Sequence, residues 1–254
     1  MKRNFGEETI TYFAEEDFTD VVENNNYGDY TKPPIPEGWY YVEGMWYTGY
    51  CIQDLKGNQF VWVPVGFLDP NGTLDGKNFS FKFGRRNYCN NEFSRYEFNE
   101  MLDEDLLMQW ESIKKYGGFY ISRYNISKIK KAPQSVKGEM PWTDITGYDA
   151  MKAAEGFGNG DSVTSHLPFG AEYDTTLEWY IKSGKKRKAD ICSDFTNGVD
   201  FYEWTQERYN CPYLVIRGVN SDSRGNYYPV GYRDCMRPIF HHFWVGFRAV
   251  LCIK

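Results

Sequence analysis

Short runs of aromatic and β-branched residues, separated by turn residues, are the feature that most restricts the fold of this chain. Two such runs cover residues 38–54 and 58–67, and the sequence Leu-Lys-Gly-Asn at 55–58 is a turn signal between them. These side chains suit the half-buried surface of a pleated sheet. The pattern predicts a β-hairpin here and a further strand over residues 77–88, where phenylalanine alternates with polar residues.

Three segments between the predicted strands have helical patterning. Apolar residues share one face over 99–116, and two glycines follow at 117 and 118. A short helix is predicted from Thr146 to Glu155 and ends at Gly156, and another lies within 168–184 and ends at Gly184. Strands are predicted over 118–127, 213–219 and 245–254, with residues 246–251 as one continuous strand. Strands, helices and then loop-rich strands indicate an α+β protein.

Composition restricts the partners and the compartment. The chain has 254 residues and a net charge of -6, which argues against a nucleic-acid partner. No apolar run approaches 18 residues, so membrane insertion is not expected, and the first residues lack the apolar core of a signal peptide. Synthesis in the cytoplasm is expected. Residues 1–35 are acidic, rich in asparagine and end in a proline cluster, which predicts an N-terminal arm or linker before a domain over 36–254.

The segment before the last predicted strand is unusually dense in aromatic rings. Residues 239–244 read Ile-Phe-His-His-Phe-Trp without a regular period. Loops on a rigid scaffold often carry recognition sites, and Tyr, Trp and Arg are enriched at binding hot spots. Strand-like alternation would turn Tyr232, Ile239 and Trp244 inward and leave the other side chains as a ligand-binding surface. The candidate ligand-binding residues are Tyr227, Tyr228, Arg233, Asp234, Arg237, Phe240, His241, His242 and Phe243.

Seven segments occur in the order found in one protein family. They are residues 117–127, 141–150, 165–180, 197–205, 215–219, 231–234 and 246–251. In these segments the chain resembles the formylglycine-generating-enzyme-like (sulfatase-modifying factor) family, whose domain is a variant of the C-type lectin fold. The match covers 117–254, and the hairpin segment resembles the entry region of bacterial and phage members.

The resemblance implies a C-type lectin-like α+β domain with an N-terminal arm and a β-hairpin extension. It assigns structural roles to six residues of the matched motifs. A carboxylate beside a tryptophan needs a partner when buried, and Arg217 and Arg248 are both candidate partners for Glu203. The six structural residues are Glu203, Trp204, Arg217, Gly246, Phe247 and Arg248.

The founding activity of that family is the copper-dependent oxidation of a substrate cysteine, which resembles chemistry on two closely spaced thiolates. Here the interval 219–245 contains only Cys235, while Cys211 and Cys252 lie outside it. An iron-dependent branch uses histidine ligands, and the chain has His166, His241 and His242. Catalytic motifs such as GxSxG, HExxH and the P-loop are absent from the sequence. The protein is therefore expected not to be an enzyme and to need no cofactor, although the family often carries structural calcium, for which Asn197 and Asp200 are weak candidates.

The expected function is the binding of a host cell-surface protein or glycan. A surface binder without a signal peptide is most simply a phage tail or virion protein, or part of a phage-like particle, that is assembled in the cytoplasm. Its arm would contact other particle subunits, and a homo-oligomer is compatible with this role. The aromatic segment also resembles the variable proteins of diversity-generating retroelements. Two alternatives stay open, a copper-dependent formylglycine-generating oxidase and a structural virion protein that uses the same surface for assembly.

Overall fold

The computed structural model describes nine ranges of the chain: 28–66, 73–74, 77–78, 83–84, 104–158, 161–184, 201–209, 212–218 and 230–254. Residues 1–27, which form most of the expected arm, lie outside these ranges. So does most of the strand predicted over 77–88, of which Lys77–Asn78 is described as β5, paired with β4 at Thr73–Leu74. In the described part of the chain, no helix is long and apolar enough to cross a membrane.

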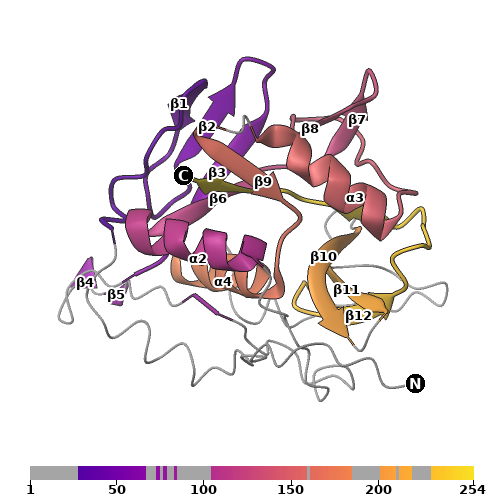
Figure 1. Ribbon diagram of the computed structural model, residues 1–254. Coiled ribbons are helices and arrows are strands. Elements are labelled where there is room, and N and C mark those ends of the chain that lie inside the picture. The colour runs from indigo at the N-terminus through magenta and orange to yellow at the C-terminus, as the bar shows by residue number, and fades with distance from the viewer. Residues whose placement is uncertain are drawn as a thin grey trace.

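A six-stranded sheet in which all neighbours are antiparallel forms the larger layer (Figure 1). The hairpin predicted between 38–54 and 58–67 is confirmed, because its two inner strands pair across the turn, where Asp54 Oδ1 accepts hydrogen bonds from the backbone of Lys56 and Asn58. The strand order is β1 (Trp39–Glu43), β2 (Cys51–Asp54), β3 (Gln59–Pro64), β6 (Gly118–Ser122), β14 (Val250–Ile253) and β9 (Val163–His166).

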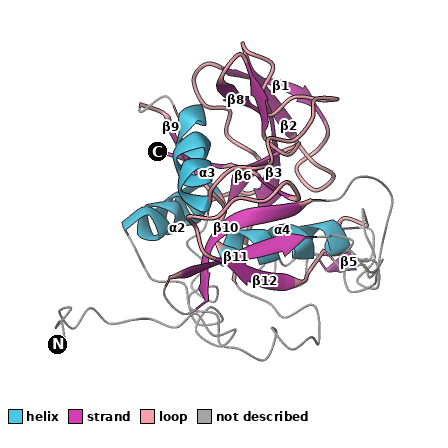
Figure 2. Cartoon of the chain, turned by 90° about the vertical axis from the view of Figure 1, so that its right-hand side faces the viewer, coloured by secondary structure: helices cyan, strands magenta, loops and turns pink. Residues whose placement is uncertain are grey.

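A second sheet of four strands lies below the first in Figure 2. Its order is β12 (Arg233–Met236), β11 (Tyr213–Gly218), β10 (Tyr202–Tyr209) and β13 (Val245–Phe247), with β10 and β13 parallel. The prediction of one strand over 246–251 is wrong, because the chain leaves the small sheet after Phe247 and enters the large sheet at Val250. Arg248 lies at the break, where its Nη1 donates to the backbone oxygens of Ser122 and Arg123.

The three predicted helices are confirmed. They are α2 (Glu104–Tyr116), α3 (Gly147–Ala154) and α4 (Gly170–Lys182), and a 3-10 turn, η2 (Glu155–Phe157), extends α3. The Thr146 side chain accepts a hydrogen bond from the Asp149 backbone and caps α3. Gly117 ends α2 with a φ of 74°, a conformation that glycine adopts without strain. Sheets and helices together form an α+β protein.

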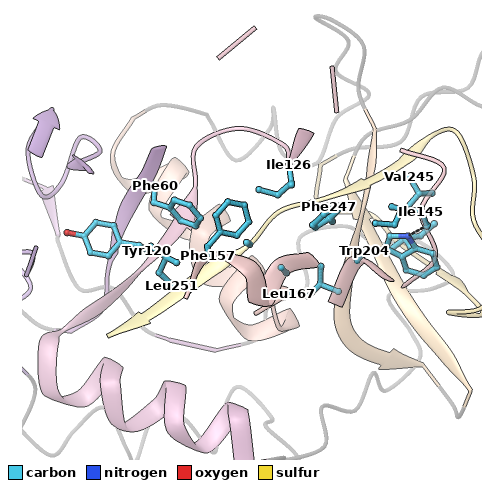
Figure 3. Packing of buried hydrophobic residues seen from close by; sticks show 14 of the residues in the cluster. Phe60, Tyr120, Ile126, Ile145, Phe157, Leu167, Trp204, Val245, Phe247 and Leu251 are labelled. Atoms are coloured by element: carbon cyan, nitrogen blue, oxygen red, sulfur yellow. Dashed lines mark hydrogen bonds between the residues drawn. The ribbon is translucent and has the colours of Figure 1, made fainter. Parts of the chain in front are cut away.

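The core follows the alternation of side chains along the strands of the large sheet. Trp62, Tyr120 and Leu251 point to one face, where they join residues of α3, η2 and the small sheet (Figure 3). Val63 and Val250 point to the other face, which α2 and α4 cover. The indole Nε1 of Trp204 donates to the Ile145 carbonyl at 3.0 Å, which fixes the small sheet to the segment before α3 (Figure 3).

The end of the expected arm packs on the domain. Tyr30 is buried beside Trp46, with ring centroids 5.2 Å apart, and its carbonyl accepts a hydrogen bond from Trp62 Nε1. The Tyr120 hydroxyl donates to the Pro34 carbonyl at 2.9 Å. Residues 28–34 therefore belong to the folded domain in the described structure.

Candidate ligand-binding surface

The segment between β12 and β13 crosses the small sheet, because these two strands form its opposite edges. We call residues 237–244 the aromatic loop. It lies at the right-hand edge of Figure 1, in yellow, beside α3. A connection that spans the sheet from edge to edge, held by a strand at each end, presents its side chains from a fixed base.

Hydrogen bonds of the backbone fix the shape of the aromatic loop. The Pro238 carbonyl accepts from the Tyr148 backbone at 3.4 Å, and the His242 carbonyl accepts from both Asp144 and Val245. Pro238 is buried against the start of α3, where a Cβ added to Gly147 would lie 3.1 Å from Pro238. The loop is thus attached to α3 through Pro238 and to the segment before α3 through His242.

Three apolar side chains of the loop face solvent. Ile239 is 58% exposed, Phe240 52% and Phe243 58%, and Tyr148 at the start of α3 adds a fourth exposed apolar side chain. The prediction that Ile239 points inward is wrong, because the loop lacks the two-residue alternation of a strand. Tyr232 is buried as predicted, and Trp244 is half-buried against Phe243, with ring centroids 4.9 Å apart.

Two histidines add polar groups to this surface. His241 Nδ1 lies 2.6 Å from Asp144 Oδ1, so the carboxylate orients the imidazole. His242 stacks on Phe243 with ring centroids 4.6 Å apart and 20° between the planes. Its Nδ1 accepts a hydrogen bond from the Trp244 backbone, which leaves Nε2 as the protonated nitrogen of the neutral ring. The loop therefore offers flat apolar rings beside hydrogen-bond donors.

The other predicted ligand-binding residues have different positions. Arg237 is exposed with its guanidinium 5.6 Å from the Tyr213 ring centroid. Asp234 is half-buried and accepts from the Cys235 backbone, and burial raises the pKa of its carboxyl. Tyr227 and Tyr228 lie outside the described residues, as do the calcium candidates Asn197 and Asp200.

Arg233 does not belong to the exposed surface, and the prediction that it does is wrong. It is 4% exposed and lies in a closed ring of four charges, which we call the buried quartet. Asp174 accepts from Arg217 at 2.6 Å and from Arg233 at 2.5 Å, and Glu207 accepts from the same two arginines at 3.1 and 2.9 Å. Two carboxylates and two guanidiniums cancel in charge, so the group is tolerated in the interior. The quartet joins α4 to three strands of the small sheet and fixes the strand that leads into the aromatic loop.

Of the two candidate partners of Glu203, Arg248 binds it, and its Nε donates to Oε1 at 2.8 Å. Arg217 belongs to the quartet instead. Glu203 Oε2 is buried and has no hydrogen-bond partner among the described residues. The matched motifs meet in the small sheet, where Glu203 lies opposite both Arg217 and Gly246, and Trp204 lies opposite Phe247.

The thiols and histidines considered for metal chemistry are dispersed. Cys235 is half-buried. Burial raises the pKa of its thiol, and the nearby negative charge of Asp234 raises it further. His166 on β9 lies 2.9 Å from Glu172 Oε1 on α4, and it lines a cavity of about 330 Å³ together with Cys252 and Gln206. Across the described ranges, no three His, Cys, Asp or Glu residues are grouped so as to hold a metal ion. Cys89, Cys192 and Cys211 lie outside those ranges.

Comparison with known proteins identifies no family or relative for this chain. The chain matches no protein-family model, and it has no significant match among curated proteins.

Proposed function

We propose that this chain is a non-enzymatic binding protein that uses the aromatic loop to attach to a protein or glycan on a host cell surface. The observation that carries the proposal is the exposure of Ile239, Phe240 and Phe243 on a loop whose backbone is hydrogen-bonded to α3 and to the segment before it. Rings displayed in water gain free energy when a partner covers them. A loop that is already ordered loses less conformational entropy on binding than a flexible one, so more of that gain becomes affinity.

The chemistry of the loop suits a ligand with both flat apolar and hydroxyl-bearing parts. Phe243 and the stacked His242 form an exposed pair of rings, and Asp144 with His241 offers an acceptor and a donor at the same surface. Rings stack on the apolar faces of sugars and on aromatic side chains of proteins alike. Arg237 adds a charged group suited to a hot spot.

We further propose that the domain is a variant of the C-type lectin-like fold of the formylglycine-generating type. The alignment of Glu203, Arg217, Gly246 and Phe247 at neighbouring positions of the small sheet supports this proposal, because these residues come from the motifs on which the resemblance rests. In this proposal the protein is a tail or virion component of a phage or phage-like particle, and its N-terminal arm contacts other particle subunits.

The binding role is tested with a double variant, Phe240→Ser with Phe243→Ser. Fluorescently labelled protein is applied to a panel of bacterial strains, and cell-bound fluorescence is measured. The matched control is Tyr40→Ser with Val42→Ser, which removes two exposed apolar side chains from β1. We expect loss of about 2–4 kcal/mol of binding free energy in the loop variant, because hot-spot residues each contribute at least about 2 kcal/mol and are not additive, and little loss in the control.

Two outcomes would contradict the proposal. If the loop variant binds cells as the unmodified protein does but loses self-association in sedimentation velocity, the loop is an assembly surface. If the purified protein, given Cu(I) and a cysteine-containing peptide, consumes oxygen and forms an aldehyde, the protein is an oxidase.

A further inference from the structure

A second charged surface lies on the hairpin of β7 (Ser127–Ile129) and β8 (Ala132–Gln134) at the upper right of Figure 1. Residues 123–138 contain five basic residues and no acidic residue, although the chain as a whole has a net charge of -6. The basic residues are Arg123, Lys128, Lys130, Lys131 and Lys137.

Four of these charges are free to meet an external anion. Arg123 is engaged with Glu43, but Lys128, Lys130, Lys131 and Lys137 are exposed and form no ion pair with any described residue. We call these four the lysine patch. The ammonium of Lys128 lies 4.3 Å from the centroid of the Trp142 ring, so the patch has an aromatic side chain at its base.

The turn that carries two of the lysines is strained. Lys130 and Lys131 form the two-residue loop between Ile129 and Ala132, with φ values of 50° and 70°. A loop with positive φ at both positions is a type I′ turn, which strongly prefers Asn-Gly or Asp-Gly. Lysine in this conformation carries a steric cost that asparagine and glycine avoid. The backbone therefore gives no reason for two lysines at this tip, and strained residues of this kind cluster at functional sites.

We propose that the lysine patch binds an acidic polysaccharide, a polymer of sugars that bears carboxylate or sulfate groups. The four exposed ammonium groups supply charge complementarity, and the Lys128 ammonium lies over the half-buried ring of Trp142. A nucleic acid suits this chain less well, because the net charge is -6 and nucleic-acid-binding domains are typically basic. The site is separate from the aromatic loop, and the two surfaces can be tested independently.

The test exploits the strain in the turn. The variant Lys130→Asn with Lys131→Gly removes two charges and installs the preferred turn sequence, so it is expected to fold with an unchanged or higher melting temperature. Binding to polygalacturonate and to dextran sulfate is measured by biolayer interferometry at 50 and 300 mM NaCl, with neutral dextran as the reference polymer. We expect about a tenfold weaker binding of the variant to the acidic polymers, from the loss of two surface charge contacts. The binding of the unmodified protein should weaken at the higher salt concentration.

The control is Lys32→Gln with Lys115→Gln, which removes two positive charges from exposed positions away from the lysine patch, Lys115 on α2 and Lys32 in an ion pair with Asp29. It should bind both acidic polymers as the unmodified protein does. The proposal is overturned if the unmodified protein does not distinguish acidic polymers from dextran, or if the control loses as much affinity as the turn variant. Tighter binding to double-stranded DNA or to phosphatidylserine vesicles than to either acidic polymer would also overturn it, in favour of those partners. The variant Phe240→Ser with Phe243→Ser should retain polymer binding, which separates this site from the aromatic loop.

Discussion

The buried quartet makes a sharp prediction about stability, because each of its four members is bonded to two others. The perturbation is Asp174→Asn, which preserves the shape of the side chain and removes its charge. Asp174 accepts two charge-assisted hydrogen bonds, from Arg217 at 2.6 Å and from Arg233 at 2.5 Å. After the substitution, the two buried guanidiniums keep the carboxylate of Glu207 as a shared partner and lose the negative charge of Asp174.

The expected loss is about 3–5 kcal/mol in the free energy of unfolding. Hydrogen bonds to charged groups contribute about 1.5–3 kcal/mol each, so two of them give about 3–6 kcal/mol. Removal of one partner from a buried ion pair costs about 3–5 kcal/mol in measured cases, which agrees with that sum. For a domain of this size, each kcal/mol lowers the melting temperature by about 2–4 °C.

The assay is urea unfolding followed by tryptophan fluorescence, with melting temperatures from differential scanning calorimetry. The matched control is Glu111→Gln, which removes one carboxylate from the exposed Glu111–Lys114 pair and should cost about 0.5 kcal/mol or less. A second substitution, Arg233→Gln, added to Asp174→Asn restores neutrality and should cost less than the sum of the two single changes. If Asp174→Asn costs no more than Glu111→Gln, the quartet does not stabilise the interior and the reasoning is refuted.

Three further substitutions probe the interior of the large sheet. Gly118→Ala would place a Cβ 2.4 Å from the Trp62 ring, and overpacking should cost about 1–3 kcal/mol, measured by urea unfolding; an unchanged midpoint would contradict this. Burial raises the pKa of the Cys252 thiol from 9.0 to about 11, so its neutral form stabilises the fold below pH 9 and that contribution falls as the pH rises to 11. Two pKa units correspond to about 2–3 kcal/mol, and Cys252→Ala should show a shallower loss of stability over this range; parallel curves would count against it. Arg248→Lys replaces a guanidinium that binds Glu203 and two backbone carbonyls by a single ammonium group. The free energy of unfolding should fall by about 2 kcal/mol and the melting temperature by about 4–8 °C; an unaltered melting curve would refute this.

The elements with strong local signals could be predicted from the sequence. The hairpin over 38–67 has a turn sequence between two aromatic runs, and α2 and α3 have periodic apolar faces and glycine ends, so local patterns decided them. The strand over 246–251 was predicted as one because its composition is uniformly strand-like. Its division depends on Arg248, whose acceptors lie about 45 and 125 residues earlier in the chain.

The candidate site shows the same limit. Exposed rings at 240 and 243 were predicted from their density, since a loop cannot bury every ring. Arg233 was placed on the surface because its two carboxylate partners are 59 and 26 residues away in the sequence, and no local pattern signals them. No local pattern showed that Ile239 would face outward, because the backbone of the loop is bonded to Asp144 and Tyr148, which lie about 90–100 residues earlier in the chain.

The position of β14 has a consequence for how the molecule assembles. Residues 250–253 form β14, which lies between β6 and β9. The ribosome synthesises β14 more than 80 residues after both of these strands, so the sheet is completed only when β14 pairs with them. Until those four residues leave the ribosome, β6 and β9 have no common neighbour, and the apolar rows on both faces of the sheet stay uncovered along that gap. Folding of the large sheet is therefore governed by distant pairings, which makes it slow and exposes the nascent protein to aggregation.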